Sequence, residues 1–431
     1  MDKNNGAIYD ARKLGKPKMI ILGVQHMFAM FGATILVPIL TGLDISTTLL
    51  MAGLGTLLFH CITKFKVPAF LGSSFAFLGG YAAIKAFSPN DPNSMLPYAC
   101  LGVACAGLIY FILAAVIKAV GIEKVMRFFP PVVTGPIIIA IGLGLAPSAV
   151  SNCTTNWFLA VVALAVIVVF NIWGKGMAKI IPIILGLLIS YGTGLVLYFI
   201  SQANPDLIQN VPWLFSGGAD ANGVYQPIFD FTSLNTICDN ISKGHIFGSE
   251  GLIGIPIHWD KTVFGGIDYS NGALIASSII AIVPIAFATM MEHIGDICAI
   301  SSTTGNNYIK DPGLHRTLVG DGLATTLASL FGGPANTTYG ENTGVLALTR
   351  VYDPRVIRIA AYFAVAVSFF PIVSVIIGSI PSCIIGGISF VLYGMISAIG
   401  VRNVVENKVD FTKSRNLIVA AAILVCELGL S

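Results

Sequence analysis

The chain has 431 residues, of which 55% are hydrophobic and only 10% are charged. A soluble domain is about 25% charged, so this chain has too little charge to cover a water-facing surface, and a soluble protein is excluded. The formal net charge of +3 does not indicate nucleic-acid binding, because the basic residues are spread over many short segments.

Apolar runs of about 20 residues recur along the chain, each long enough to cross a bilayer as a helix. The first run is too long for a signal-peptide core and has no small-residue cleavage site, so we expect it to be retained. In chain order the predicted spans are 18–40, 47–63, 67–84, 97–119, 131–149, 157–174, 178–201, 270–298, 314–332, 336–350, 355–378, 380–399 and 416–431. The pattern predicts an all-α polytopic membrane protein.

Lysine and arginine favour the cytoplasmic side of a membrane, and their distribution predicts the orientation. If the N-terminus is cytoplasmic, the inner segments carry 21 of the 24 basic residues, and the outer side keeps only Lys85, Lys243 and Lys261. One missed or added helix would destroy this asymmetry. The count therefore supports thirteen spans, with the long acidic connection 202–269 as an extracellular loop.

This loop leaves seven spans before it and six after it, and the two halves resemble each other. The third span is interrupted at Gly72, and the tenth at Pro334 and Gly340. Paired short spans broken by glycine or proline indicate a transporter's binding site near the midplane. Because seven is odd, the repeats would be inverted. A seven-helix repeat also predicts a fourteenth helix beyond Ser431, so we expect this sequence to lack the last helix of the repeat.

Few ionisable residues lie inside the apolar spans, and such residues by default mark a site or a pathway. They are His26, Glu292, His293, Asp296, Asp321 and Glu341. Glu292 and Asp296 are four residues apart and share one helical face. Two such carboxylates in a low dielectric are not expected to ionise together, which suits proton coupling. Asp321 either takes part in coupling or anchors the broken helix, and His26 and His293 are interpreted mainly as structural supports.

Glu341 lies in a polar run within a membrane span, between the flexible residues Gly340 and Gly344. Carboxylates accept hydrogen bonds from N–H groups, and a protonated carboxyl also donates to C=O. Two glutamates and free backbone N–H groups suit a small, flat, neutral ligand on which Phe75 and Tyr339 could close. An anionic substrate would instead require lysine or arginine at the breaks.

Other chemistry has little support in the sequence. The eight cysteines form no C-x-x-C pair, so we expect no metal site and no cofactor. The chain lacks H-E-x-x-H and G-x-S-x-G motifs, and its carboxylates need no catalytic role. We therefore expect a protein that is not an enzyme.

Five stretches of the chain carry a resemblance to a known family. They begin at Gln25-His26-Met27, Pro68-Ala69-Phe70, Glu292-His293-Ile294-Gly295, Asp311-Pro312-Gly313 and Asn336-Thr337-Thr338. At these residues the chain resembles the nucleobase–ascorbate transporter family and, within it, the bacterial uracil permease branch. The similarity runs from Gln25 to about Asn416.

The resemblance implies two inverted seven-helix repeats, with short antiparallel strands in spans 3 and 10. The core domain would comprise 18–119 and 270–378, and the gate domain 131–201 and 380–431. It also implies a homodimer formed through the gate domain.

The resemblance assigns substrate binding to Glu292 and Glu341, with backbone contacts at Phe75 and Gly340. Tyr339 and Ala33 would line the pocket. The supporting and proton-coupling positions would be His26, Asp296 and Asp321, together with Glu292 itself. These assignments are implied by the family and do not follow from spacing alone.

Two positions differ between branches of the family. Asp296 replaces a histidine of some uracil permeases, and both Asp296 and Asp321 resemble xanthine transporters. Glu341, however, stands where xanthine and ascorbate members typically have glutamine.

We therefore expect a secondary active transporter that imports uracil with protons by alternating access across the cell inner membrane. A xanthine or purine symporter is the alternative, and a channel or anion exchanger on the same fold represents another class.

Overall fold

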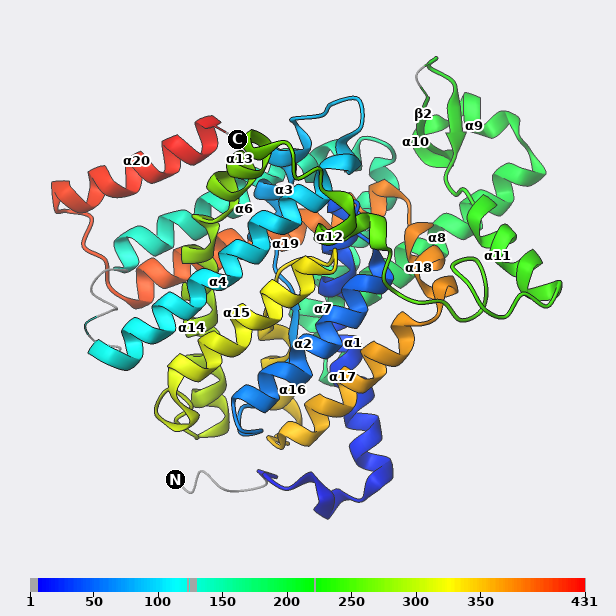
Figure 1. Cartoon of the computed structure of the whole chain (residues 1–431). Helices are drawn as coiled ribbons and strands as arrows, with labels where there is room; N and C mark the ends of the chain where they lie inside the picture. Colours follow the sequence, from blue (N-terminus) through cyan, green and yellow to red (C-terminus); the bar gives the residue numbers. More distant parts are fainter. Residues whose placement is uncertain (1–6, 122–123, 125–129, 221, 431) are drawn as a thin grey trace. The chain divides into compact units, whose positions relative to one another are not determined.

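The computed structural model describes residues 7–121, 124, 130–220 and 222–430. The chain forms two compact units, each built from two separate stretches of sequence (Figure 1). Unit 1 comprises Met1–Phe128 and His245–Ser374, and unit 2 comprises Phe129–Gly244 and Val375–Ser431. The 21 basic residues counted above on the inner side include Lys3 and Arg127, which lie outside the described residues, as does Ser431.

Unit 1 consists mainly of helices, with two short strands in place of helix at its centre. Its first stretch contains η1 (Ala11–Leu14), α1 (Lys16–Thr41), α2 (Ile45–Ile62), β1 (Leu71–Ser73), α3 (Leu78–Lys85), η2 (Pro92–Met95) and α4 (Leu96–Val120). Its second contains η4 (Trp259–Lys261), α12 (Val263–Gly266), α13 (Gly272–Ile282), α14 (Ile285–Thr304), η5 (Ile309–Gly313), α15 (Leu314–Leu330), β4 (Asn336–Thr338), α16 (Gly340–Thr349), α17 (Pro354–Ser368) and the start of α18 (Pro371–Gly378).

Local sequence explains where the helices around the site begin and end. Gly42 ends α1 in a left-handed conformation with φ of 86°, which glycine adopts without steric cost. Asp44 then caps α2 by accepting a hydrogen bond from Thr47 N at 2.7 Å. Helix α15 packs against both α2 and α4. A Cβ atom at Gly107 of α4 would lie 2.7 Å from the carbonyl oxygen of Gly322, so glycine permits this close helix crossing.

Unit 2 contains the remaining long helices. They are α6 (Pro131–Cys153), α7 (Trp157–Trp173), α8 (Pro182–Ala203), α19 (Ser382–Glu406) and α20 (Ser414–Leu430), with η3 (Gly176–Lys179) between α7 and α8. Helices α6 and α19 pack along much of their length. Gly142 of α6 and Gly386 of α19 both lie at this crossing, where an added Cβ would meet backbone of the facing helix at 2.5 and 2.6 Å.

The predicted spans correspond to the observed elements, which confirms an all-α membrane fold with strands in spans 3 and 10. Among the described residues, seven helices are long and apolar enough to cross a bilayer, or eight if bent pairs count as one span. The other predicted spans are shorter, more polar or broken. The eighth predicted span is one of the seven long helices, Gly272–Thr304, within which Pro284 lies between α13 and α14. The eleventh, expected as one helix, bends by 86° between α17 and α18.

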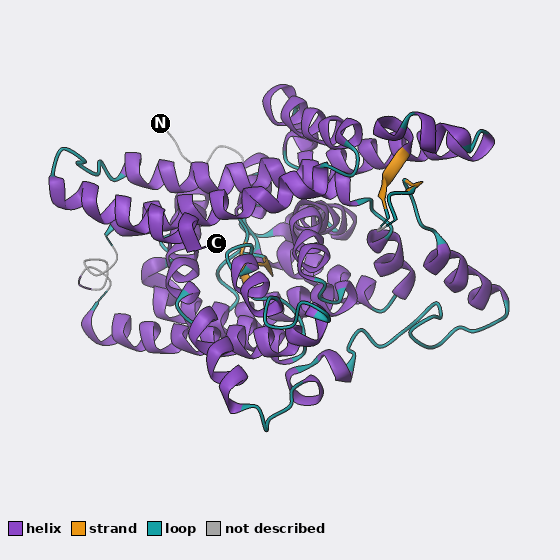
Figure 2. Ribbon diagram, turned by 90° about the horizontal axis from the view of Figure 1, so that it is seen from above, coloured by secondary structure: helices purple, strands orange, loops and turns teal. Residues whose placement is uncertain are grey.

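The connection 202–269, predicted as a surface loop, has secondary structure of its own. It contains α9 (Asp206–Asn210), α10 (Pro212–Phe215), a hairpin of β2 (Ser216–Ala219) and β3 (Tyr225–Pro227), α11 (Thr232–Ser242), η4 and α12. Its first part belongs to unit 2 and its last part, from His245, to unit 1. Figure 2 shows this hairpin and the β1–β4 pair as the orange strands among purple helices.

Candidate functional site

The centre of unit 1 is a two-stranded antiparallel sheet formed by the two broken spans. Strand β1 pairs with β4 in the register Leu71 to Thr338, Gly72 to Thr337 and Ser73 to Asn336. The pairing extends by one bond at each end, with Ser74 N donating to Ala335 O at 2.8 Å and Tyr339 N to Phe70 O at 3.0 Å. Each strand leads into a short helix, β1 into α3 and β4 into α16.

Neighbouring helices satisfy the backbone and side-chain groups of these strands. On α2, Thr56 Oγ1 accepts a hydrogen bond from Leu71 N at 2.9 Å and lies 3.2 Å from Leu71 O. Thr325 Oγ1 of α15 donates to Asn336 O at 2.7 Å, and Asn336 Nδ2 donates to Met51 O at 3.0 Å. Non-helical backbone is tolerated within a membrane only where such partners exist, so α2 and α15 make the paired breaks possible.

Three predicted site residues lie beside one another on α14 and α16. Glu292 and Asp296 are on α14, and Glu341 is the second residue of α16. Glu292 and Glu341 interact electrostatically, so the two side chains repel each other when both are ionised. Asp296 interacts electrostatically with both glutamates. The structure therefore brings the predicted carboxylates together.

Strand β4 contributes a contact to this group that was not predicted. Thr338 Oγ1 donates to Asp296 Oδ2 at 2.7 Å. The same hydroxyl lies 3.4 Å from His293 Nδ1, and this nitrogen also lies 3.3 Å from Asp321 Oδ2 of α15. His293 and Asp321 are both fully buried. A continuous polar chain therefore runs from Asp296 through Thr338 and His293 to Asp321.

His26 supports the site from α1. It is fully buried, and Asn342 Nδ2 lies 3.2 Å from His26 Nδ1 and donates to His26 O at 3.1 Å. Asn342 follows Glu341 on the first turn of α16. His26 thus orients the helix turn that carries Glu341 and has no observed contact with Glu341 itself.

The aromatic and backbone positions differ in how accessible they are. Tyr339 is 5% exposed, and its hydroxyl donates to Ser73 O at 2.9 Å, so here it braces β1. Phe75 is half-buried in the turn before α3, Ala33 of α1 is buried, and Gly340 is exposed with open space where a Cβ would be.

The start of α16 has unused hydrogen-bonding capacity. The first N–H groups of any helix lack intrahelical acceptors, and Tyr339, the N-cap of α16, provides no side-chain hydrogen bond. The residue preceding α3, Phe77, provides none either. Two half-helix N-termini with partial positive charge therefore flank the strand pair. Across the described part of the chain, no group of three or more His, Cys, Asp or Glu side chains is arranged to hold a metal ion.

Comparison with known proteins places the chain in a family. The family model described as "Permease family" matches residues 17–431. The chain belongs to this permease family. It is therefore a multi-pass membrane protein, in agreement with its apolar helices.

Relatives in the permease family are similar along almost the whole chain. The "Uracil permease" of Bacillus caldolyticus is 39% identical over 95% of this chain and 85% of its own length. The "Uracil permease" of Bacillus subtilis (strain 168) is 38% identical with the same coverage. The "Putative pyrimidine permease RutG" of Escherichia coli (strain K12) is 35% identical over 99% of this chain and 86% of its own length.

Solved structures support the fold of this permease. The transmembrane domain of the cyanobacterial bicarbonate transporter BicA superposes with a TM-score of 0.65 at 12% identity, covering 98% of this chain and 97% of that one. SLC26A9 gives a TM-score of 0.53 at 11% identity, covering 98% of this chain and 63% of that one. At such low identity the similarity shows the fold alone.

Proposed function

We propose that this permease imports uracil together with protons by alternating access. The observation that carries the proposal is the pair of glutamates, Glu292 and Glu341, set beside the uncapped start of α16 in the centre of unit 1. Uracil presents two N–H donors and two carbonyl acceptors on a flat ring. The relatives named as uracil or pyrimidine permeases, which match at least 95% of this chain, support this choice of substrate.

Each proposed contact matches a group of the site to a group of the ligand. Glu292 and Glu341 accept from the ring N–H groups, and the N–H groups at Gly340 and Phe75 donate to the carbonyl oxygens. Ala33 and the rings of Phe75 and Tyr339 line the flat faces.

The proposed coupling to protons follows from the electrostatic repulsion between the carboxylates of Glu292 and Glu341. Two ionised glutamates side by side in a low dielectric oppose each other, and a neutral ligand does not offset their charge. A proton taken up by one of them, or by Asp296, relieves the repulsion and adds a donor for a uracil carbonyl. Asp296, held by Thr338, and Asp321, beyond His293, are the proposed supporting groups of this proton site.

The two units have different proposed roles. Unit 1, which carries every predicted site residue, is the core domain, and unit 2 is the gate domain, through which two copies of the chain form a homodimer. The proposed location is the cell inner membrane with the N-terminus in the cytoplasm, because the basic residues gather in the segments on that side.

Uptake of radiolabelled uracil by cells that lack their own uracil permease tests the proposal. Expression of the chain is expected to give uptake that a protonophore abolishes and that excess unlabelled xanthine leaves intact. Uptake blocked by xanthine would indicate a purine transporter or one that carries both substrates. This is the second candidate, because Asp296 and Asp321 resemble the residues of xanthine transporters. Uptake that persists with a protonophore would contradict proton coupling.

A channel or anion exchanger remains the candidate from another class, since a bicarbonate transporter has the same fold. Segments 67–78 and 332–344, which contain the two breaks, have no lysine or arginine, and the carboxylates of Glu292 and Glu341 would repel an anion. Accumulation of uracil against its gradient would exclude a channel.

A further inference from the structure

The N-terminal segment Ala7–Leu14 packs against the rest of unit 1, at the C-terminal ends of α14 and α16. Ile8 forms a parallel bridge with Val351. Its N–H donates to Arg350 O at 2.8 Å, and its carbonyl oxygen accepts from Tyr352 N at 2.8 Å. Arg350 directly follows α16, so Ile8 holds the C-terminal end of the helix that carries Glu341.

Tyr9 holds the end of the other site helix. Its hydroxyl donates to Thr304 O at 2.7 Å, and Thr304 is the last residue of α14. The Tyr9 ring also packs edge-on against Tyr352, with 5.5 Å between ring centroids. Two consecutive residues, Ile8 and Tyr9, therefore connect the ends of α16 and α14.

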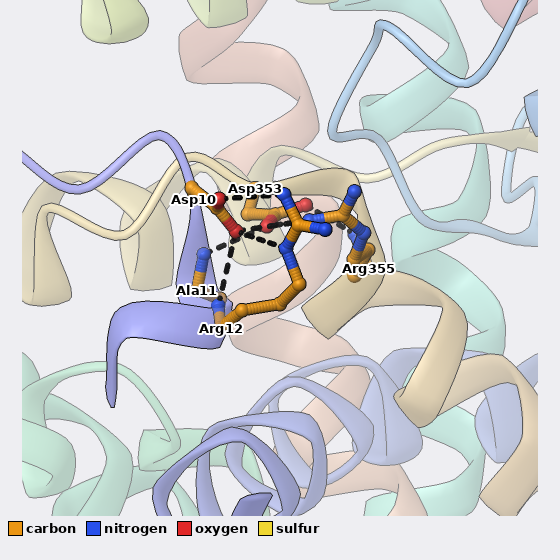
Figure 3. A network of polar contacts seen from close by, with 5 residues as sticks. All are labelled: Asp10, Ala11, Arg12, Asp353 and Arg355. Carbon is orange, nitrogen blue, oxygen red and sulfur yellow. Dashed lines mark hydrogen bonds and ion pairs between the residues drawn. The ribbon is translucent and has the colours of Figure 1, made fainter. Parts of the chain in front are cut away.

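A polar network fixes the segment in this position (Figure 3). Ala11 N donates to Asp353 Oδ2 at 2.7 Å. Asp10 pairs with Arg12 at 2.8 Å and with Arg355 at 3.0 Å, and Arg355 also contacts Asp353. The guanidinium groups are matched by carboxylates within the network, so it needs no bound anion and serves as an attachment.

The attachment persists at any pH near neutrality. The hydrogen bond from Arg12 lowers the pKa of Asp10 below its usual range. A group whose folded-state pKa is lowered gives its stabilisation above its unfolded pKa and loses it only as the pH falls through the folded value. Asp10 therefore stays ionised and paired in any cytoplasm.

Apolar contacts complete the docking. Ala11, Val351 and Val356 form a buried cluster, and Ile8 and Leu14 pack against it. Burying such side chains is favourable at about 25 cal/mol per Å², so the segment is held by packing as well as by polar bonds.

We propose that Ala7–Leu14 is a positioning clip that ties the C-terminal ends of α14 and α16 together and so sets the separation of the Glu292 and Glu341 carboxyls. This inference rests on the proposed function, because the glutamates are taken as the substrate ligands. A helix rises about 1.5 Å per residue and is stiff over a few turns. The clip lies twelve residues from Glu292 and nine from Glu341, so it acts on the site through the two helices.

Three single variants test the clip in purified permease in lipid nanodiscs. Tyr9→Phe removes the hydroxyl bonded to Thr304 and keeps the ring. Asp10→Asn removes the charge that pairs with Arg12 and Arg355. The matched control is Lys13→Gln, in the same segment, at an exposed side chain outside the network. The readouts are backbone hydrogen exchange and the Kd for uracil.

Tyr9→Phe is expected to speed hydrogen exchange about fivefold at residues 301–305, because it removes one hydrogen bond worth about 1 kcal/mol. Asp10→Asn is expected to speed exchange by a similar factor at residues 350–355. Both should weaken uracil binding about fivefold, in the range of ordinary site–site coupling, and Lys13→Gln should change neither. A general loss of structure would instead speed exchange throughout unit 1.

The clip is overturned if both variants match Lys13→Gln in exchange at the helix ends, or if exchange rises there and uracil affinity stays unchanged. If the unaltered chain binds no uracil, the proposed function is wrong, and hydrogen exchange alone tests the clip. Exchange at the helix ends that stays unchanged in Tyr9→Phe and Asp10→Asn would again overturn the clip.

Discussion

Replacing each glutamate of the site by glutamine is the most direct test of how the site binds. Glu292→Gln and Glu341→Gln keep the size of the side chain and remove its charge. A hydrogen bond to a charged group contributes about 1.5–3 kcal/mol, which corresponds to roughly 10- to 150-fold in Kd. Each variant is therefore expected to weaken uracil binding by at least tenfold, measured by isothermal titration calorimetry on the purified permease.

The same two substitutions should not lower the stability of the protein, although they weaken binding, because the Glu292 and Glu341 carboxyls repel each other when both are ionised. Removing one charge relieves that repulsion, so the Tm of either variant is expected to equal or exceed that of the parent. The control is Glu406→Gln, which alters an exposed glutamate paired with Arg402 at the end of α19 and should leave binding unchanged. Full uracil affinity in both site variants would refute the reasoning, and a lower Tm would show that the loss of binding reflects damage to the fold.

Three further predictions concern the strand pair and its partners. Asp296→Asn should reduce uptake against a gradient more than uracil binding, and concentrative uptake that persists would place the proton site elsewhere. A double-mutant cycle of Asp296→Asn with Thr338→Val, read by thermal unfolding, should give a coupling energy of about 1–3 kcal/mol, whereas additive losses would show that the 2.7 Å bond contributes nothing. Gly72→Ala should lower stability by about 1–3 kcal/mol, because its Cβ would lie 2.5 Å from Tyr339 Cζ. Gly79→Ala, in open space, is its control, and equal Tm values for the two would contradict the overlap.

The broken spans could be predicted from the sequence because glycine and proline interrupt otherwise apolar runs at Gly72 and Pro334. Those residues interfere with helix locally, and a local signal is visible without a structure. The 86° bend between α17 and α18 was not predicted, although Pro371 marks the start of α18, because the apolar run continues on both sides of this proline. Composition therefore shows which residues lie in membrane helices, but it does not show where such a helix changes direction.

The carboxylates of the site were predictable for a related reason, since a charge in an apolar span is rare and costly. Their partners were not. Thr338 and Asn342 are uncharged, and which side chain each one meets depends on the strand register and on the contact between α1 and α16. The sequence indicates a structural role for His293, but its contact with Asp321 at 3.3 Å depends on how α14 packs against α15.

The register of β1 against β4 has an evolutionary consequence. Side chains on a strand alternate between its two faces, so inserting one residue before Asn336 would turn the Thr338 hydroxyl away from Asp296 and present Thr337 instead. Only three residue pairs define the register of the two strands, so few other pairings can restore it after such a change. Among descendants of this gene, substitutions in 71–73 and 336–338 should accumulate far more readily than changes of length, so an alignment gap there would mark a transporter that has changed or lost its cargo.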